Sequence, residues 1–386
     1  MAMINPYRPG AGLMPGCLAG REETINEVTQ VFDALTHGVP VQSIVFSGLR
    51  GTGKTVLLNR LESIAGDMGI YSSHIEVEER DDFISQIIAC AKTYLTHIRN
   101  MDKVKTLISK TLDAITSLAV SFDPESGTFS LSVQDRALFQ NGNLNQSLTQ
   151  VFTALGETAS KSDVPICFFV DEMQYINKEE LGALIVALHR ANQLGYPIMV
   201  IGTGVPKIYQ LLSKAKTYSE RLFLYREISS LDLTQTRYAI VEPAKKLNIN
   251  FDADASDEVF EITKGYPFFI QQLGKVLFDE LKGSRIDKKM VDRIKPTYYE
   301  TLDSGFYKTR YERCSDSEKD FIFAMANQKK LPCEIARIAK SMKKELKAIS
   351  PLRAKLINKG IIYSPDRGLL DFTVPEFDLY LRRISK

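Results

Sequence analysis

The chain has 386 residues, which at about 150 residues per domain predicts two to three domains. Apolar residues make up 44% and charged residues 25%, which excludes global disorder and fibrous structure, and a net charge of +2 gives no overall field that demands nucleic acid or a membrane. No apolar run approaches the ~18 residues of a membrane-spanning helix, no signal peptide is evident, and five scattered cysteines without a CxxC pair indicate reduced thiols in a cytoplasmic protein.

The first 230 residues alternate between short apolar runs and helical patterns. Residues 1–20 contain three prolines and four glycines and predict an extended arm. Apolar residues then recur at helical spacing from Arg21 to about Leu35. The strand pattern at 41–46 is followed by a glycine-rich turn and a helix, and the further apolar runs lie at 70–77, 165–170 and 196–202. Because these runs lack clean alternation, they are typical of strands covered on both faces, and the whole predicts a parallel α/β sheet.

Residues 97–145 interrupt this rhythm. Ser117–Phe122 and Thr128–Val133 alternate on either side of a turn at 123–127, which predicts a β-hairpin inside an insertion whose function the sequence does not indicate. Residues 231–312 are helical in pattern throughout, and 313–386 change to short helices with a terminal hairpin.

The stretch Gly48–Thr55, GLRGTGKT, satisfies the pattern G-x-x-x-x-G-K-[ST] and lies between a predicted strand and a predicted helix. Glycines allow consecutive backbone N–H groups to curl around a polyphosphate, and the helix that follows offers its positive N-terminus. Lys54 would neutralise the β- and γ-phosphates, and the Thr55 hydroxyl would bind Mg²⁺. The predicted nucleotide-binding residues of this loop are Gly48, Arg50, Gly51, Thr52, Gly53, Lys54, Thr55 and Val56.

Two adjacent carboxylates follow the apolar run at 165–170. This run predicts a buried strand that delivers Asp171 to its carboxyl end, where ligands bind in open α/β sheets. Asp171 would hold Mg²⁺ and Glu172 would activate water as a general base. The alternative for such a pair is a solvated strand end.

Together with the lead-in Leu18–Glu22, these two motifs resemble the P-loop ATPases of the AAA+ and STAND type. More closely the chain resembles origin-recognition-like and archaeal-type ATPases, and bacterial proteins that begin NPY-x-PGAG and end in a winged helix. The resemblance covers nearly the whole chain outside 97–145. It implies ATP and Mg²⁺ as ligands, and an AAA+ α/β core followed by an all-helical lid and a winged helix. The implied domains are an arm (1–20), the core (21–230), the lid (231–312) and the winged-helix domain (313–386).

The resemblance also implies roles for residues outside the two motifs. Leu18 to Arg21 would line the adenine pocket, with Tyr7 of the arm over it, although a plain surface arm with a satisfied Arg21 is the alternative. Thr203 follows the strand pattern at 196–202 and matches a polar sensor near the γ-phosphate; the alternative is a turn that ends the strand.

Two further residues bear on how the nucleotide would control the chain. Arg221 matches an arginine finger that completes a neighbouring subunit's site, which requires a head-to-tail homo-oligomer; the alternative is a solvated helix face. Pro267, in Gly265-Tyr266-Pro267, matches the glycine-x-proline with which STAND ATPases reach the nucleotide from the lid. The sensor arginine of AAA+ loaders is not evident before Arg285, which favours a slow switch over a processive motor.

The last 71 residues form a basic module, because Asp316–Lys386 carries 15 Lys and Arg against 9 Asp and Glu, while the remainder carries 34 against 38. A helix at 334–340, a second at Leu352–Asn358 with Ser350 as its N-cap and Pro351 in its first turn, and a hairpin to Thr373 resemble a winged helix. In DNA-bound forms the second helix enters the major groove, and Arg353, Lys355 and Lys359 would face outwards. Docking of protein and autoinhibition are the alternatives.

Three functions therefore remain open from the sequence. The first is an ATPase that binds double-stranded DNA in the origin-recognition manner. The second is a signalling or defence switch whose winged helix docks protein, and the third is a scaffold that binds nucleotide and scarcely hydrolyses it.

Overall fold

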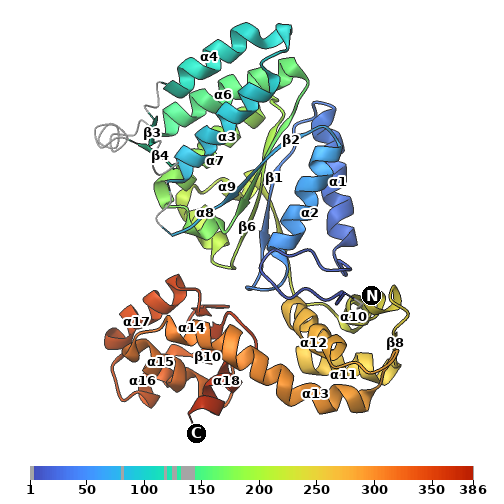
Figure 1. Ribbon diagram of the computed structural model, residues 1–386. Coiled ribbons are helices and arrows are strands. Elements are labelled where there is room, and N and C mark those ends of the chain that lie inside the picture. The colour runs from blue at the N-terminus through green and yellow to red at the C-terminus, as the bar shows by residue number, and fades with distance from the viewer. Residues whose placement is uncertain (1–3, 80–81, 117–119, 124–127, 132–143, 386) are drawn as a thin grey trace. The chain divides into compact units, whose positions relative to one another are not determined.

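The computed structural model describes residues 4–79, 82–116, 120–123, 128–131 and 144–385 (Figure 1). The chain divides into two compact units. We call Arg21–Gly48 with Lys54–Glu227 the sheet unit, and Met1–Gly20 with Leu49–Gly53 and Ile228–Lys386 the helical unit. No helix among the described residues is both long and apolar enough to cross a bilayer. All five cysteines lie in described segments, and no disulfide joins them.

The sheet unit is built on five parallel strands in the order β2-β5-β6-β1-β7. They are β1 (Ser43–Ser47), β2 (Tyr71–Glu76), β5 (Ile166–Asp171), β6 (Ile198–Gly204) and β7 (Phe223–Glu227). The predicted parallel α/β sheet is confirmed. The sequence did not predict β7, because this edge strand is only half-buried and ends on Arg226 and Glu227 rather than running through apolar residues.

Helices cover both faces of this sheet, with α1 and α2 on one face and α3, α6 and α7 on the other (Figure 1). Neighbouring residues of β5 show why: the Phe168 ring packs at 5.9 Å from Phe152 of α6, and the Phe169 ring packs at 6.4 Å from Phe32 of α1. Side chains alternate between the faces of a strand, so a strand buried on both faces must be apolar throughout. The helices of the unit are α1 (Glu22–Thr36), α2 (Lys54–Asp67), α3 (Phe83–Ile98), α4 (Lys105–Thr116), α6 (Leu144–Ser162), α7 (Lys178–Gln193), α8 (Ile208–Ala215) and α9 (Ser219–Leu222).

The predicted insertion contains a helix as well as the predicted hairpin. Strands β3 (Val120–Asp123) and β4 (Thr128–Leu131) pair antiparallel, which confirms the hairpin where the structure describes it. Its turn at 124–127 and its predicted ends at 117–119 and 132–133 lie outside the described residues. Helix α4 was not predicted; it packs on α6, where the hydroxyls of Thr111 and Thr158 lie 3.0 Å apart.

The helical unit begins with the arm, whose described residues 4–20 contain no helix or strand. Tyr7 is buried in the core of this unit, and its hydroxyl donates a hydrogen bond to the Ile240 carbonyl. Its ring lies so close to Gly274 that a Cβ there would come within 2.6 Å of it. The expectation that Tyr7 covers an adenine pocket is therefore wrong, because its side chain is used to fasten the arm to the lid.

The lid consists of helices, as predicted, with one added pair of two-residue strands, β8 (Asn250–Phe251) and β9 (Arg285–Ile286), that lie parallel. Its helices are α10 (Leu233–Lys245), α11 (Ala253–Thr263), α12 (Pro267–Asp279), α13 (Lys288–Thr301), a π-helical turn at Leu302–Tyr307 and α14 (Lys308–Glu312). A capping box starts α10, where Asp232 and Gln235 exchange side-chain and backbone hydrogen bonds.

The C-terminal region is a winged helix, as predicted. Helices α15 (Asp316–Ala326), α16 (Ile335–Ser341) and α17 (Leu346–Asn358) accompany a three-stranded antiparallel sheet in the order β10-β12-β11. The strands are β10 (Cys333–Glu334), β11 (Ile362–Tyr363) and β12 (Leu369–Phe372). A further helix, α18 (Phe377–Ile384), ends the chain and was not predicted.

Helix α17 starts six residues earlier than the sequence suggested. Ser350 does not cap it, since its hydroxyl donates to the Leu346 carbonyl one turn back, and Pro351 lies inside the helix. The buried side chain of Ile349 explains the difference. Its packing in the first turn compensates for the backbone hydrogen bond that Pro351 cannot donate.

Two of the three cations predicted to face outwards on α17 are partly buried. The Lys359 ammonium bonds the buried Glu318 carboxylate at 2.6 Å and the Arg313 carbonyl at 2.9 Å. The Nε atom of Arg353 is buried. Of the three, only Lys355 is exposed as expected.

Candidate nucleotide site and winged-helix surface

The carboxyl ends of three adjacent strands bring five of the predicted site residues of the sheet unit together. Strand β6 lies between β1 and β5 in the sheet, so the residues that follow β1, end β5 and end β6 share one edge. This edge holds Lys54 and Thr55 at the start of α2, Asp171 and Glu172 at the end of β5, and Thr203 near the end of β6. The sequence had placed these residues in three separate motifs, and the parallel register joins them.

Asp171 is the centre of this cluster and is 2% exposed. One carboxylate oxygen accepts a hydrogen bond of 2.6 Å from the Thr55 hydroxyl. The other accepts from the Thr203 hydroxyl and, at 2.9 Å, from the Glu172 N–H. These hydrogen bonds fix the orientation of the carboxylate. They also offset the free-energy cost of burying its charge.

Lys54 is the first residue of α2 and is buried, and its ammonium donates to the Gly48 carbonyl at 3.0 Å. The Gly48 N–H in turn donates to the Gly204 carbonyl at the end of β6. The ammonium therefore lies at the positive N-terminus of a helix, where the two together favour a bound anion. Gly53, just before Lys54, has φ +89°, a conformation that favours glycine and accounts for that position of the motif.

The donor set fits Mg²⁺ rather than a soft metal. A threonine hydroxyl beside an aspartate carboxylate offers hard oxygen ligands, and Mg²⁺ is commonly held by one or two such groups together with phosphate and water oxygens. Within the described residues no group of three or more His, Cys, Asp or Glu side chains could hold a metal by itself. A cation at Thr55 and Asp171 would thus depend on a bound phosphate.

The segment Leu49–Gly53 belongs to the helical unit, where it meets the start of α12. A Cβ on Gly51 would come within 2.9 Å of the Tyr266 ring, and the Gly51 carbonyl accepts from the Phe268 N–H at 3.4 Å. Tyr266 is the N-cap of α12 and Pro267 is its first residue, as predicted. Pro267 therefore starts the helix whose first turn contacts the glycine loop.

Cations surround the buried hydroxyl of Tyr266. Arg310 stacks its guanidinium over the Phe306 ring at 3.8 Å. Burial, together with the positive charges of Arg50 and Arg313, lowers the pKa of Arg310 to about 10. Burial raises the pKa of Tyr266, against the effect of Arg310 and Arg50. Arg310 is a charged group of this region that the sequence motifs did not indicate.

The predicted adenine-pocket residues straddle the boundary between the units. Leu18 is half-buried in the helical unit, and the neighbouring Ala19 joins its core. Arg21 is buried at the N-cap of α1 in the sheet unit, where burial lowers its pKa and the Glu22 carboxylate opposes this.

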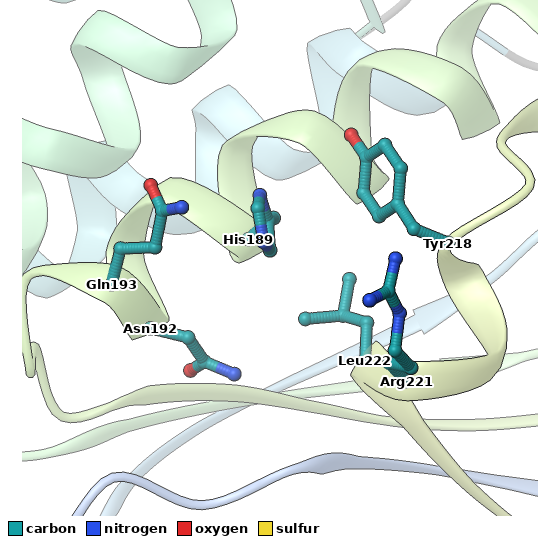
Figure 2. Close-up of a pocket in the computed structure, with 6 residues that line it drawn as sticks. All are labelled: His189, Asn192, Gln193, Tyr218, Arg221 and Leu222. Carbon is teal, nitrogen blue, oxygen red and sulfur yellow. The ribbon is translucent and has the colours of Figure 1, made fainter.

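Arg221 lies at the opposite end of the sheet from Asp171. Phe223 pairs with Ser43, the first residue of β1, and the Gln42 side chain donates to the Arg221 carbonyl at 2.7 Å. A strand of five residues at about 3.3 Å per residue separates the two ends by ~13–16 Å, which a side chain of the same unit does not bridge. Arg221 instead lines an exposed hollow of 580 Å³ with His189, Asn192, Gln193, Tyr218 and Leu222 (Figure 2).

Gln174 contacts the group of residues around Asp171, and sequence reasoning missed it. Its side-chain amide donates to the Glu172 carboxylate, and its carbonyl oxygen accepts from the Val205 N–H at 3.1 Å. The only signal in the sequence is a polar residue two positions after the Asp-Glu pair, which by itself does not indicate contact.

The basic surface of the winged helix lies earlier along the chain than predicted. The exposed cations of α16, α17 and the turn between them are Arg337, Lys340, Lys343, Lys344, Lys347 and Lys355. Three of these lysines lie in the turn and the first turn of α17, the part of a recognition helix that contacts base edges in helix-turn-helix proteins.

Comparison with known proteins identifies parts of the chain. Residues 18–201 match the family model of the AAA ATPase domain, and residues 304–381 match a domain of unknown function (DUF8462). No curated protein matches the sequence. A Walker-type ATPase of Pyrococcus abyssi is 15% identical with a TM-score of 0.58, covering 95% of this chain and 96% of that one. The Orc1 protein of Aeropyrum pernix, solved in complex with DNA, is 16% identical with a TM-score of 0.50, covering 96% and 92%. Residues 18–201 therefore resemble an AAA ATPase domain, which confirms the predicted resemblance to P-loop ATPases of this type, and the two solved structures show a shared fold.

Proposed function

We propose that this protein binds ATP with Mg²⁺, hydrolyses it slowly to ADP, and uses the bound nucleotide as a conformational switch. The observation that supports this most directly is the hydrogen-bonded arrangement of Thr55, Asp171 and Thr203 beside Lys54 at the end of a glycine-rich loop. The test is a calorimetric titration of the wild-type chain and a Lys54→Ala variant with ATP and Mg²⁺, in which only the wild type should bind.

The loop residues would hold the polyphosphate mainly through the backbone. Gly48, Arg50, Gly51, Thr52 and Gly53 form the cradle, and Val56 continues it into the first turn of α2. Lys54 would pair with the β- and γ-phosphates. Thr55 and Asp171 would hold Mg²⁺, which when bound neutralises phosphate charge.

Glu172 would act as the general base of hydrolysis. Its carboxylate accepts a proton from a water molecule as that oxygen forms a bond to the γ-phosphorus, and the bond from phosphorus to the bridging oxygen breaks so that ADP leaves with the electron pair. Thr203, which is fully buried and bonded to Asp171, would act as the polar sensor that keeps this carboxylate aligned.

We assign the adenine to the segment from Leu18 to Arg21, and a further nucleotide contact to Pro267 at the start of α12. A ligand that prefers one arrangement of two parts shifts the population towards it by its difference in affinity. Helix α12 contains no arginine, which supports a slow switch rather than a processive motor.

We assign Arg221 to a neighbouring subunit's nucleotide. Its place at the amino ends of the strands excludes a role in its own site, and its exposure suits contact with another copy in a head-to-tail homo-oligomer. Mixing Arg221→Ala with Lys54→Ala protein should restore part of the ATPase activity that each lacks, because mixed oligomers pair an intact loop with an intact arginine. Arg190→Ala, on the exposed face of α7, is the matched control for Arg221. No rescue where mixed oligomers demonstrably form would reject the assignment.

We further propose that the winged helix binds double-stranded DNA. The exposed lysines at the start of α17 support this, because phosphate contacts supply much of the affinity for DNA. Replacing Lys343, Lys344 and Lys347 by alanine should weaken binding and lower the slope of log affinity against log salt by about 2 to 3. Lys282→Ala, an exposed lysine of the lid, is the control. Unchanged affinity and slope would exclude DNA contact by this helix.

A specific observation favours a second candidate, a signalling or defence switch of the STAND type whose winged helix docks protein. Leu346 is 47% exposed between the lysines of this basic surface, and Arg353 and Lys359 are partly buried. Exposed apolar side chains ringed by charge are typical of protein interfaces. This function would be favoured if the lysine variants bound DNA as the wild type does and Leu346→Ser lost binding to a protein partner. In either case we place the protein in the cytoplasm, without a membrane partner.

A further inference from the structure

Gln174 lies in a short 3₁₀ turn, Met173–Tyr175, that directly follows the proposed general base. Glu172 adopts a left-handed backbone, φ 55° and ψ 39°, which costs a non-glycine residue about 1 kcal/mol or more and persists where surrounding contacts hold it. Met173 provides one such contact: it is fully buried, and a Cβ on Gly202 would come within 1.9 Å of its sulfur. This contact holds the turn against β6.

The Gln174 side chain bridges the ends of two strands. Its Nε2 donates to Oε2 of Glu172, which follows β5, and its Oε1 accepts from the N–H of Val205, which follows β6. The orientation of the amide is determined by these partners, because a flipped amide would direct its NH₂ at an N–H and its oxygen at a carboxylate. Gly204 permits the close approach, since a Cβ there would lie 3.2 Å from Oε1.

We propose that Gln174 is a positioning residue for ATP hydrolysis, which fixes the Glu172 carboxylate relative to the strand end that carries Thr203. This inference rests on the proposed role of Glu172 as general base. A misplacement of about 1 Å in a catalytic group can lower a rate by about 100-fold. Gln174 therefore sets the place of the Glu172 carboxylate.

The test is Gln174→Glu, which keeps the size of the side chain and an acceptor for the Val205 N–H. It replaces the donor with a second carboxylate, which repels Glu172 and cannot hold it in place. We expect kcat at pH 7 to fall at least about 10-fold and the Kd for ATP to stay within about threefold, a split that a general loss of structure would not give. Gln174→Met, which also lacks the donor, should lower kcat in the same way. Gln30→Glu, the same change at an exposed position of α1, should leave both values unchanged.

A double-mutant cycle separates positioning from a general effect on the fold. If Gln174 acts through Glu172, adding Gln174→Glu to Glu172→Gln should lower kcat no further, whereas independent effects would multiply. A wild-type kcat in Gln174→Glu, or a faster rate, would overturn the proposal while the Glu172→Gln loss stands. Normal turnover by Glu172→Gln would instead reject the proposed function, and the role of Gln174 with it.

Discussion

Lys54→Ala is expected to abolish measurable binding of ATP. Lys54 is 6% exposed and lies at the N-terminus of α2, where its ammonium bonds the Gly48 carbonyl. Removing one partner of a buried, hydrogen-bonded charge pair costs about 2–5 kcal/mol, which corresponds to a loss of affinity of about 30- to 4000-fold. Calorimetric titration with ATP and Mg²⁺ measures this loss directly.

The matched control is Lys161→Ala, because Lys161 is exposed near the end of α6, just before the amino end of β5 and thus at the far edge of the sheet. It should bind ATP as the wild type does. Melting temperatures should confirm that both variants are folded. Tight ATP binding by folded Lys54→Ala protein would show that the loop does not hold the phosphates, and the proposed function would fall with it.

The sequence predicted those parts of the fold in which local pattern and burial agree. The strand that ends at Asp171 could be predicted because a strand buried between helices must be apolar on both faces, and Phe168 and Phe169 meet that requirement. Strand β7 could not, because an edge strand is buried on fewer sides and tolerates Arg226, which pairs with Glu27. The start of α17 was misplaced because Ser350-Pro351 is a strong local signal for a helix start, and the burial of Ile349 overrides it.

The predicted members of the catalytic cluster came from motifs, and the missed one came from geometry. Asp171 and Thr55 are 116 positions apart, yet two known motifs place them after strands that end at the same edge of the sheet. Gln174 belongs to neither motif, and its contact with Val205 depends on the register between β5 and β6 and on the space left by Gly204. Arg310 could not be predicted for the same reason, because tertiary packing brings Arg50 and Arg313 near it. A single sequence shows which residues have suitable chemistry, but tertiary packing decides which of them meet.

Glu172→Gln should leave ATP binding intact and slow hydrolysis by about 100- to 10,000-fold, the range that general acid–base catalysis contributes. Glutamine keeps the size of the side chain and an oxygen that can accept the hydrogen bond from Gln174, so the local fold should persist. A neutral amide cannot take a proton from water, and the loss should therefore fall on kcat while the Kd for ATP stays constant.

Single-turnover release of phosphate from a preformed ATP complex isolates the chemical step in this variant. Glu179→Gln is the control, since Glu179 is exposed in the first turn of α7 and only its backbone N–H takes part, as a donor to Asn177. Its rate should equal that of the wild type. If Glu172→Gln released phosphate at the wild-type rate, another group would have to accept the proton, and the base would have to be sought among residues other than the Asp-Glu pair at the end of β5. If it instead failed to bind ATP, Glu172 would be needed to form the site rather than to perform the chemistry.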